Sequence, residues 1–234
     1  MAPSPHLLLP GGTHERSAVL AELASTLSIL RPGQRLLVGI DGVDGAGKST
    51  FADELALRVQ DSRPIMRISL DDFHNPRDIR YQRGRGSPEG FWLDSYNFEQ
   101  FKDYVLKPLT SGSKTIRDRG HVLETDETVD PEPVNAATSA VVIVDGLFLH
   151  REELDPTWDY SIFLDVPFTV TAKRMAVRDG TPVDDPSHGR YVGGQRLYFT
   201  AADPASKASL IIENSHPNML RVLTLAAVSY SSKH

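Results

Sequence analysis

The 234-residue sequence contains no cysteine, which excludes a disulfide framework, thiolate catalysis and a zinc site built on cysteine. It also lacks a long apolar run: the strongest, Ala140–Val144, is far shorter than the roughly 20 residues that span a bilayer. No stretch has the charged start and apolar core of a signal peptide. Basic residues are outnumbered, and a net charge of −6 argues against a general nucleic-acid coat. We therefore expect a cytoplasmic protein without a membrane or nucleic-acid partner.

What the sequence does contain is an ordinary globular composition, with 40% hydrophobic and 24% charged residues. The length suits a single domain spanning residues 1–234. Short apolar strands alternate with helical stretches, which favours a parallel sheet flanked by helices and therefore an α/β, doubly wound fold. The expected strands are Leu36–Ile40, Ile65–Leu70, Val141–Val144, Tyr160–Leu164 and Ser209–Ile212. The expected helices are Thr13–Leu30 with Thr13 as its N-cap, about Lys48 to Val59, and Pro167–Asp179.

Two stretches depart from this alternation. Arg77–Asp94 is rich in glycine, arginine and aromatic residues and is expected to form an ordered loop. Lys114–Pro133 carries charges and β-branched residues and is expected to form a hairpin over the edge of the sheet. Segments of this kind often shape a substrate pocket.

The sharpest motif is Gly42-Val-Asp-Gly-Ala-Gly-Lys-Ser49, which matches the phosphate-binding P-loop pattern G-x-x-x-x-G-K-[ST]. The apolar run before it and the helical stretch after it supply the expected context, whereas a chance glycine-rich turn would need neither. Glycines let backbone N–H groups turn toward phosphate oxygens, and the helix N-terminus adds positive charge. The nucleotide-binding residues are therefore expected to be Gly42, Asp44, Gly45, Ala46, Gly47, Lys48, Ser49 and Thr50.

Two carboxylates follow expected strands, where the sheet of an open α/β fold binds its ligands. Asp71 stands where it can accept a proton from an attacking hydroxyl or bind Mg²⁺ through water, although Asp71 and Asp72 could instead cap a helix. Asp145, at the end of an apolar run, has the position required to hold Mg²⁺ together with the Ser49 hydroxyl.

Arginines are spaced to share a helix face near the C-terminal half. Arg174 and Arg178 lie four residues apart, and Arg190 and Arg196 follow in a glycine-containing segment that could close over ATP. Such arginines can stabilise a transferring phosphoryl group. The alternative is a solvated basic helix paired with neighbouring aspartates such as Asp179.

Taken together, the chain resembles the uridine kinase family, within a wider group that includes phosphoribulokinase, pantothenate kinase and nicotinamide riboside kinase. The resemblance extends from about residue 36 to 214 and rests on GVDGAGKST, SLDDFH, DSYNFEQF, VVIVDG and RMAVRD. It implies a P-loop kinase fold with a lid over roughly 167–200 and a substrate-covering insertion over roughly 75–133. It also implies ATP and Mg²⁺ as cofactors and phosphorylation of a nucleoside such as uridine or cytidine at its 5′-hydroxyl.

The resemblance assigns roles to particular residues. Lys48 and Ser49 would hold phosphates and metal, Asp71 would activate the acceptor hydroxyl, and Asp145 would stand near the metal. Asp94 would hold ribose hydroxyls, and Arg174 and Arg178 would be catalytic lid arginines. His121 corresponds to the base-reading histidine of uridine kinases, but the tyrosine of that motif is missing and the spacing differs by one.

Those departures leave the acceptor open. Pantothenate, nicotinamide riboside, a sugar or a sugar phosphate are alternative acceptors, and a nucleotide-dependent switch protein is an alternative from another class. Phe91, Trp92 and Tyr96 could stack on a substrate ring, although we favour core positions for them, and a structural role for His74. Association into a homo-oligomer is left open.

Overall fold

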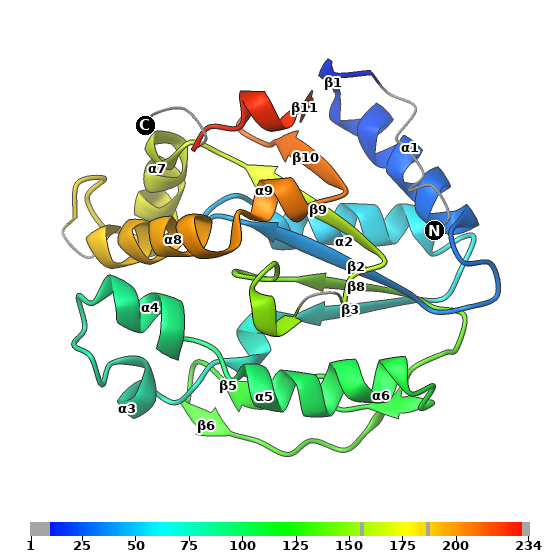
Figure 1. The fold of residues 1–234 in the computed structure, drawn as a ribbon, viewed down its shortest axis with the longest axis horizontal. Helices are drawn as coiled ribbons and strands as arrows, with labels where there is room; N and C mark the ends of the chain where they lie inside the picture. Colours follow the sequence, from blue (N-terminus) through cyan, green and yellow to red (C-terminus); the bar gives the residue numbers. More distant parts are fainter. Residues whose placement is uncertain (1–9, 155–156, 186–187, 231–234) are drawn as a thin grey trace.

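A computed structural model of the chain describes residues 10–154, 157–185 and 188–230. Within these residues the centre of the fold is a seven-stranded sheet of order β1-β11-β10-β9-β2-β8-β3 (Figure 1). Five neighbouring strands are parallel: β10 (Leu210–Glu213), β9 (Tyr160–Asp165), β2 (Leu36–Gly42), β8 (Val141–Asp145) and β3 (Ile65–Ser69). All five strands were predicted to within two residues at each end, and the doubly wound α/β class is confirmed.

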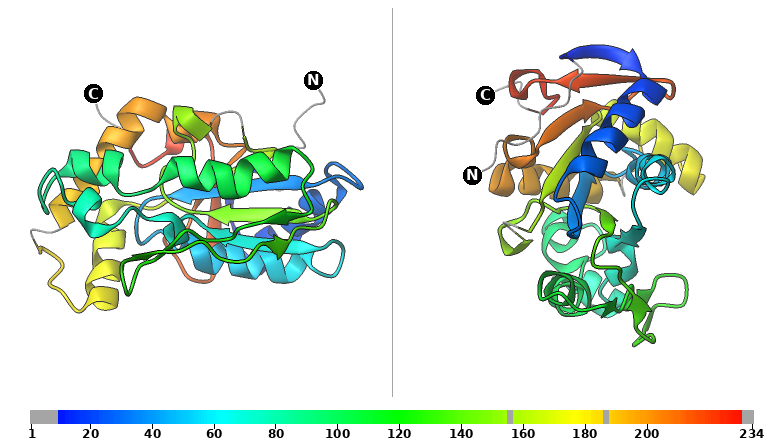
Figure 2. Two further views of the ribbon diagram at one scale, coloured as in Figure 1. Left: turned by 90° about the horizontal axis from the view of Figure 1, so that it is seen from below. Right: turned by 90° about the vertical axis from the view of Figure 1, so that its right-hand side faces the viewer.

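Both faces of the sheet are covered by helices (Figure 2). On one face, α1 (Arg16–Ile29) and α2 (Lys48–Val59) bury Val38 and Ile40. On the other face, Leu37 lies in a second core built on four helices. These are α4 (Pro88–Asp94), α5 (Phe98–Phe101), α6 (Lys107–Thr110) and α8 (His188–Ala202). Because both faces are buried, the parallel strands are continuous apolar runs rather than alternating ones, which is why they were readable in the sequence.

The N-terminal end departs from the prediction. Thr13 is not a helix N-cap: Gly12–Glu15 form strand β1, and α1 begins only at Arg16. Strand β11 (Met219–Leu223) runs antiparallel to β10 and offers its free edge, to which β1 pairs with Thr13 opposite Arg221. Pairing between β1 and β11 satisfies backbone N–H and C=O groups of both strands, which a helix cap at Thr13 could not do. The C-terminal segment therefore packs on the sheet as far as residue 230.

The stretch Arg77–Asp94 was predicted as a loop but contains two short helices, α3 (Arg77–Arg80) and α4. Ser87 caps α4 through its hydroxyl, which accepts the Gly90 N–H at 3.0 Å, and Pro88 occupies the first helical position. The hairpin predicted in Lys114–Pro133 is confirmed, since β5 (His121–Val122) pairs antiparallel with β6 (Glu127–Thr128). A further pair, β4 (Thr115–Ile116) with β7 (Val134–Asn135), closes its base.

The glycine-containing segment after α7 (Phe168–Asp179), for which the sequence predicted no regular structure, forms the long helix α8. Its glycines permit close packing: a Cβ at Gly194 would lie 2.8 Å from the Pro88 carbonyl and 2.7 Å from the Phe91 ring. α8 therefore lies directly against α4, and the short helix α9 (Pro204–Lys207) leads from it to β10. Among the helices of the described ranges, none combines the length and the apolarity that crossing a membrane requires.

Candidate active site

The P-loop joins the end of β2 to the start of α2, as predicted. Gly45 and Gly47 have φ of +75° and +81°, in the left-handed region where glycine is favoured, and Gly47 is the N-cap of α2. A Cβ at Gly42 would lie 2.6 Å from the Leu164 carbonyl, so this position tolerates no side chain. The loop is thus held against β9 while its interior faces solvent.

Lys48 is folded back over the loop, where its Nζ donates to the carbonyls of Gly42 at 3.1 Å and Val43 at 3.0 Å. Ala46 is buried, and its carbonyl accepts the Asn214 Nδ2 at 2.7 Å. Thr50 lies at the mouth of the loop, in the wall of a cavity of about 370 Å³. The Lys48 ammonium group therefore lies where it can exchange these carbonyl acceptors for the oxygens of a phosphate bound in the loop.

The expected metal ligands meet at one point beside the loop. The Ser49 Oγ donates to Asp145 Oδ2 at 2.6 Å, so the start of α2 and the end of β8 bring two oxygen ligands together. Asp145 is 2% exposed, and Arg67 Nη2 donates to its other oxygen at 2.9 Å. Within the described ranges no group of three or more His, Cys, Asp or Glu side chains could hold a metal. Two hard oxygen ligands fit Mg²⁺, which retains waters and takes substrate phosphates as further ligands.

The two predicted lid arginines share one face of α7 and both contact the P-loop. Arg174 donates to the carbonyls of Gly45 at 3.1 Å, Asn214 at 2.8 Å and Ser215 at 2.9 Å, and burial lowers its pKa. Arg174 therefore braces the loop against the segment after β10.

Arg178 is shared between the loop and its own helix. It donates to Asp179 at 2.6 Å and to Asp44 at 3.0 Å, and these two carboxylates, Asp179 first, raise its pKa. The surface alternative is thus partly right, since Asp179 is one of its partners. The action of Arg174 and Arg178 on a transferring phosphoryl group stays a prediction.

Asp71 lies in a 3₁₀ turn, Leu70–Phe73, directly after β3. Its carboxylate is exposed, and its Oδ1 accepts the Tyr96 hydroxyl at 2.9 Å. Burial, and then the Asp71 charge, raise the pKa of Tyr96 well above its usual value, so that this hydroxyl is a donor. The side chain of Asp71 is therefore held at a fixed place while one of its oxygens stays open.

Asp71 stands between two cavities. The first is the P-loop cavity, lined also by Gly47, Ser49 and Thr50. The second, of about 360 Å³, is called the acceptor cavity below for the role that we propose for it, and it is lined by Tyr81, Phe91, Tyr96, Arg80, Arg190 and Tyr191 among others. Asp44, Lys48 and Arg178 likewise line both, so the two cavities meet at these four side chains.

The acceptor cavity contains two arginines that sequence reasoning did not place there: Arg80 was given no role, and Arg190 was expected in a segment that could close over ATP. Arg190, on α8, is 5% exposed and donates to the carbonyls of Ser87 at 3.1 Å and Arg80 at 3.0 Å, and burial lowers its pKa. Arg80 pairs with Asp126 of the hairpin at 3.0 Å, while the structure gives its Nε no partner. The sequence signals for this end of the cavity were the glycine and arginine enrichment in 77–94 and the arginine at position 190.

Aromatic and histidine side chains complete the wall. Phe91 and Tyr96 are buried, as the core interpretation predicted, and also face the acceptor cavity. His74 Nδ1 lies 2.7 Å from the Asp71 carbonyl, its ring is 4.4 Å from that of Tyr96, and burial lowers its pKa.

Two predicted substrate ligands lie outside the cavity wall. Asp94, at the end of α4, is 8% exposed and paired with Arg83 at 2.8 Å. His121, in β5, is 1% exposed, with its Nε2 3.3 Å from Asp126 but not aligned for a hydrogen bond. Neither borders the acceptor cavity, and their assignment as substrate ligands stays a prediction.

Comparison with known proteins gives consistent results. The profile of the phosphoribulokinase / uridine kinase family matches residues 37–182, more than half of the chain. Nicotinamide riboside kinase 1 of Homo sapiens is 26% identical over 153 residues, which cover 65% of this chain and 69% of that protein. Uridine kinase of Leuconostoc citreum is 24% identical over 201 residues, covering 80% and 91%.

A solved structure, described as a possible uridine kinase from Bacillus stearothermophilus, superimposes with a TM-score of 0.67. It is 22% identical, and the match covers 82% of this chain and 96% of that one. This similarity supports the fold.

Proposed function

The chain belongs to the phosphoribulokinase/uridine kinase family, and we propose that it transfers the γ-phosphoryl group of ATP to the 5′-hydroxyl of a nucleoside, with uridine and cytidine as first candidates. The observation that carries this proposal is the position of Asp71. A carboxylate fixed by Tyr96 at the junction of a P-loop cavity and a separate ring-lined cavity is what transfer to a small-molecule hydroxyl requires. A nucleotide switch has no need of either the carboxylate or the second cavity.

In the proposed reaction the P-loop amides and Lys48 hold the phosphates, with the γ-phosphoryl group directed toward Asp71. Asp71 accepts the proton of the acceptor hydroxyl as that oxygen attacks phosphorus. Arg178 adds positive charge beside the loop if its Asp179 partner is exchanged for phosphate oxygens. Ser49 and Asp145 would hold Mg²⁺, which supplies charge neutralisation to the phosphates when bound.

The acceptor cavity supports a neutral ring. At the end away from the P-loop, Arg190 lies over the Tyr81 ring at 4.9 Å, and Arg80 lies over the same ring at 5.6 Å. Guanidinium groups there favour a ring that carries carbonyl acceptors, as a pyrimidine does, and repel a cationic ring.

Nicotinamide riboside, whose pyridinium ring is cationic, is the second candidate. What favours it is the match to nicotinamide riboside kinases, at 26% identity for the human protein. The arginines at that end of the cavity favour a neutral ring, whereas the sequence relatives include both a uridine kinase and nicotinamide riboside kinase, and an activity assay can decide between the two acceptors.

The test is an ADP-release screen with Mg-ATP and a panel of uridine, cytidine, purine nucleosides, nicotinamide riboside, pantothenate, sugars and pentose phosphates. We expect turnover on a pyrimidine nucleoside and none above background without acceptor. Turnover on nicotinamide riboside alone would move the assignment to the second candidate. An ATPase rate that no acceptor changes, with no phosphorylated product, would favour the switch protein instead.

A further inference from the structure

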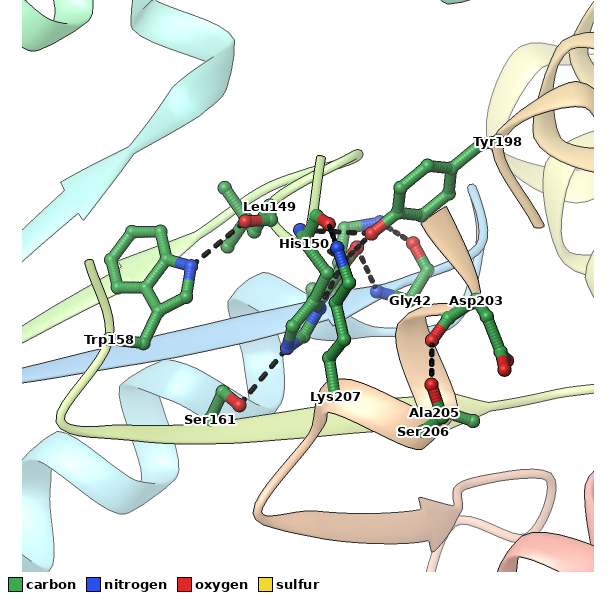
Figure 3. Close-up of polar contacts among 12 residues, drawn as sticks. Gly42, Leu149, His150, Trp158, Ser161, Tyr198, Asp203, Ala205, Ser206 and Lys207 are labelled. Atoms are coloured by element: carbon green, nitrogen blue, oxygen red, sulfur yellow. Dashed lines mark hydrogen bonds and ion pairs between the residues drawn. The ribbon is translucent and has the colours of Figure 1, made fainter. Parts of the chain in front are cut away.

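Directly beneath the P-loop lies a buried set of polar side chains that the proposed reaction does not use. Asp41, the residue before Gly42 in β2, has no exposed surface, and His150 and Tyr198 are 4% and 2% exposed. They come from three distant parts of the chain: β2, the segment after β8, and α8. Figure 3 shows the Tyr198 hydroxyl and His150 converging beside Gly42.

The carboxylate of Asp41 accepts hydrogen bonds from Gly42, His150 and Tyr198. Its Oδ1 accepts the Gly42 N–H at 2.7 Å. Its Oδ2 accepts His150 Nδ1–H at 2.8 Å, the His150 backbone N–H at 3.3 Å and the Tyr198 hydroxyl. The Asp41 carboxyl group is thus a shared acceptor that links the P-loop backbone at Gly42 to His150 and Tyr198.

The other hydrogen bonds of the set link Tyr198, His150 and Ser161. The Tyr198 oxygen, as it donates to Asp41, accepts the backbone N–H of His150 at 3.0 Å. Burial, and then the Asp41 charge, raise the pKa of Tyr198 well above its usual value, so that it keeps its proton. On the far side, His150 Nε2 lies 3.0 Å from the Ser161 Oγ, and that Oγ accepts the Ser209 N–H at 3.3 Å.

The arrangement Asp41–His150–Ser161 has the order of a hydrolytic triad, but it cannot work as one. Ser161 is 4% exposed near the start of β9, where its Oγ accepts the Ser209 N–H at 3.3 Å and its own N–H donates to the Ser209 Oγ at 3.1 Å. A nucleophile must be reachable by its substrate. These side chains therefore either support the fold alone or also position the P-loop, and their contacts with the loop distinguish the two roles.

Helix α8 holds the P-loop at two points. Tyr198 reaches Asp41, and Gln195, three residues earlier on the same face, accepts the Asp44 N–H through its Oε1 at 2.8 Å. The same helix carries Arg190, whose guanidinium binds the carbonyls of Ser87 and Arg80 beside the acceptor cavity. The loop backbone at Gly42 and Asp44 is thereby fixed by one rigid element that also contacts the acceptor side.

We propose that Asp41, His150 and Tyr198 are positioning residues that hold the Gly42 end of the P-loop in its phosphate-binding conformation, through the Gly42 N–H and through α8. They touch neither nucleotide nor acceptor. The proposal rests on the proposed function only in that ATP binds the P-loop, and it does not depend on which acceptor is used.

The test compares two buried tyrosines. Tyr198→Phe removes the hydroxyl that binds Asp41 and keeps the ring. Tyr160→Phe is the matched control, because Tyr160 is also 2% exposed, lies in neighbouring β9 and has no role in the set. Mg-ATP binding is measured by calorimetry, KM and kcat with the acceptor found in the screen, and Tm by thermal unfolding.

We expect Tyr198→Phe to raise the Kd and KM for Mg-ATP by roughly tenfold, the scale of one hydrogen bond to a charged group, with the KM for the acceptor unchanged. Tyr160→Phe should stay within twofold of the wild type. Asp41→Asn places an amide N–H among donors and should weaken Mg-ATP binding further than Tyr198→Phe does.

Equal Kd values for Mg-ATP in Tyr198→Phe and Tyr160→Phe would overturn the proposal, whatever happens to Tm. Because the Kd is read without an acceptor, failure to find any phosphorylated product would contradict the proposed function and leave this result standing. If Asp41→Asn does not fold, the pair of Tyr→Phe variants still decides.

Discussion

The Asp71→Asn variant separates the role of Asp71 as a base from its role as a structural group. Tyr96 donates to Oδ1 of Asp71 at 2.9 Å, and an asparagine at this position retains a carbonyl oxygen that can accept the same hydroxyl. The side chain should therefore stay in place, and only its capacity to take a proton is lost. The P-loop contacts of Lys48 and Ser49 involve other residues and remain.

Loss of a general base costs roughly 10²- to 10⁴-fold in turnover. At about 1.36 kcal/mol for each factor of ten, this raises the barrier by about 3–5 kcal/mol. We expect kcat to fall by at least roughly 10²-fold, the lower end of that range, while the Kd for Mg-ATP stays close to that of the wild type. The two quantities separate because Asp71 borders the P-loop cavity without binding the loop itself.

Asp72→Asn is the matched control. Asp72 is the next residue in the same turn, is exposed, and borders neither cavity. ADP release is followed at saturating Mg-ATP and acceptor for both variants, and Mg-ATP binding is followed by calorimetry. A kcat within threefold of wild type for Asp71→Asn would remove Asp71 from the role of base. An equal loss in both variants would show that the turn, and not the proton, is what matters.

Four further outcomes follow from the structure. Lys48→Ala should weaken Mg-ATP binding and lower kcat, each by roughly tenfold or more, because a charged donor to phosphate is lost; unchanged values in calorimetry and turnover would contradict the P-loop assignment. Asp145→Asn should raise the Mg²⁺ concentration for half-maximal turnover by roughly tenfold, since one anionic ligand is removed; an unchanged titration with chelated controls would exclude it as a ligand. Burial lowers the pKa of His74 in the folded state, so below its ordinary pKa of 6.5 the unfolded chain binds a proton that the folded chain does not. The wild type should therefore lose stability as the pH is lowered, and Tm should decline less between pH 7 and 5.5 in His74→Gln than in the wild type. Gly194→Ala should destabilise the fold by about 1–3 kcal/mol through overpacking on α4, whereas Gly189→Ala, whose Cβ meets no described residue within 4 Å, should stabilise α8 by up to about 1 kcal/mol in chemical denaturation.

The parts predicted correctly from the sequence are those whose determinants are local. The P-loop is eight consecutive residues between an apolar strand and a helix, and the central strands are unbroken apolar runs because both faces of the sheet are buried. Asp71 and Asp145 could be placed at the site because the carboxyl ends of parallel strands meet at one edge.

The parts that were missed depend on partners distant in the chain. Strand β1 exists because β11 offers an edge about two hundred residues later, and nothing within Gly12–Glu15 distinguishes it from a helix start. α8 contains three glycines, which lower helix propensity, and its fit against Pro88 and Phe91 is visible only in the fold.

The same distinction explains why the nucleotide side of the site is clearer than the acceptor side. The acceptor cavity takes one wall from 77–96, another from the hairpin and a third from α8. The charges on these walls therefore depend on ion pairs between distant segments, such as Arg80 with Asp126. Asp94 illustrates the consequence: its sequence context matches a ribose-binding aspartate, yet Arg83, eleven residues away, holds its carboxylate outside the cavity wall. For Asp94 to bind an acceptor, this ion pair has to open. Arg83→Ala should therefore lower the acceptor KM if Asp94 binds ribose, and leave it unchanged if the pair is only structural.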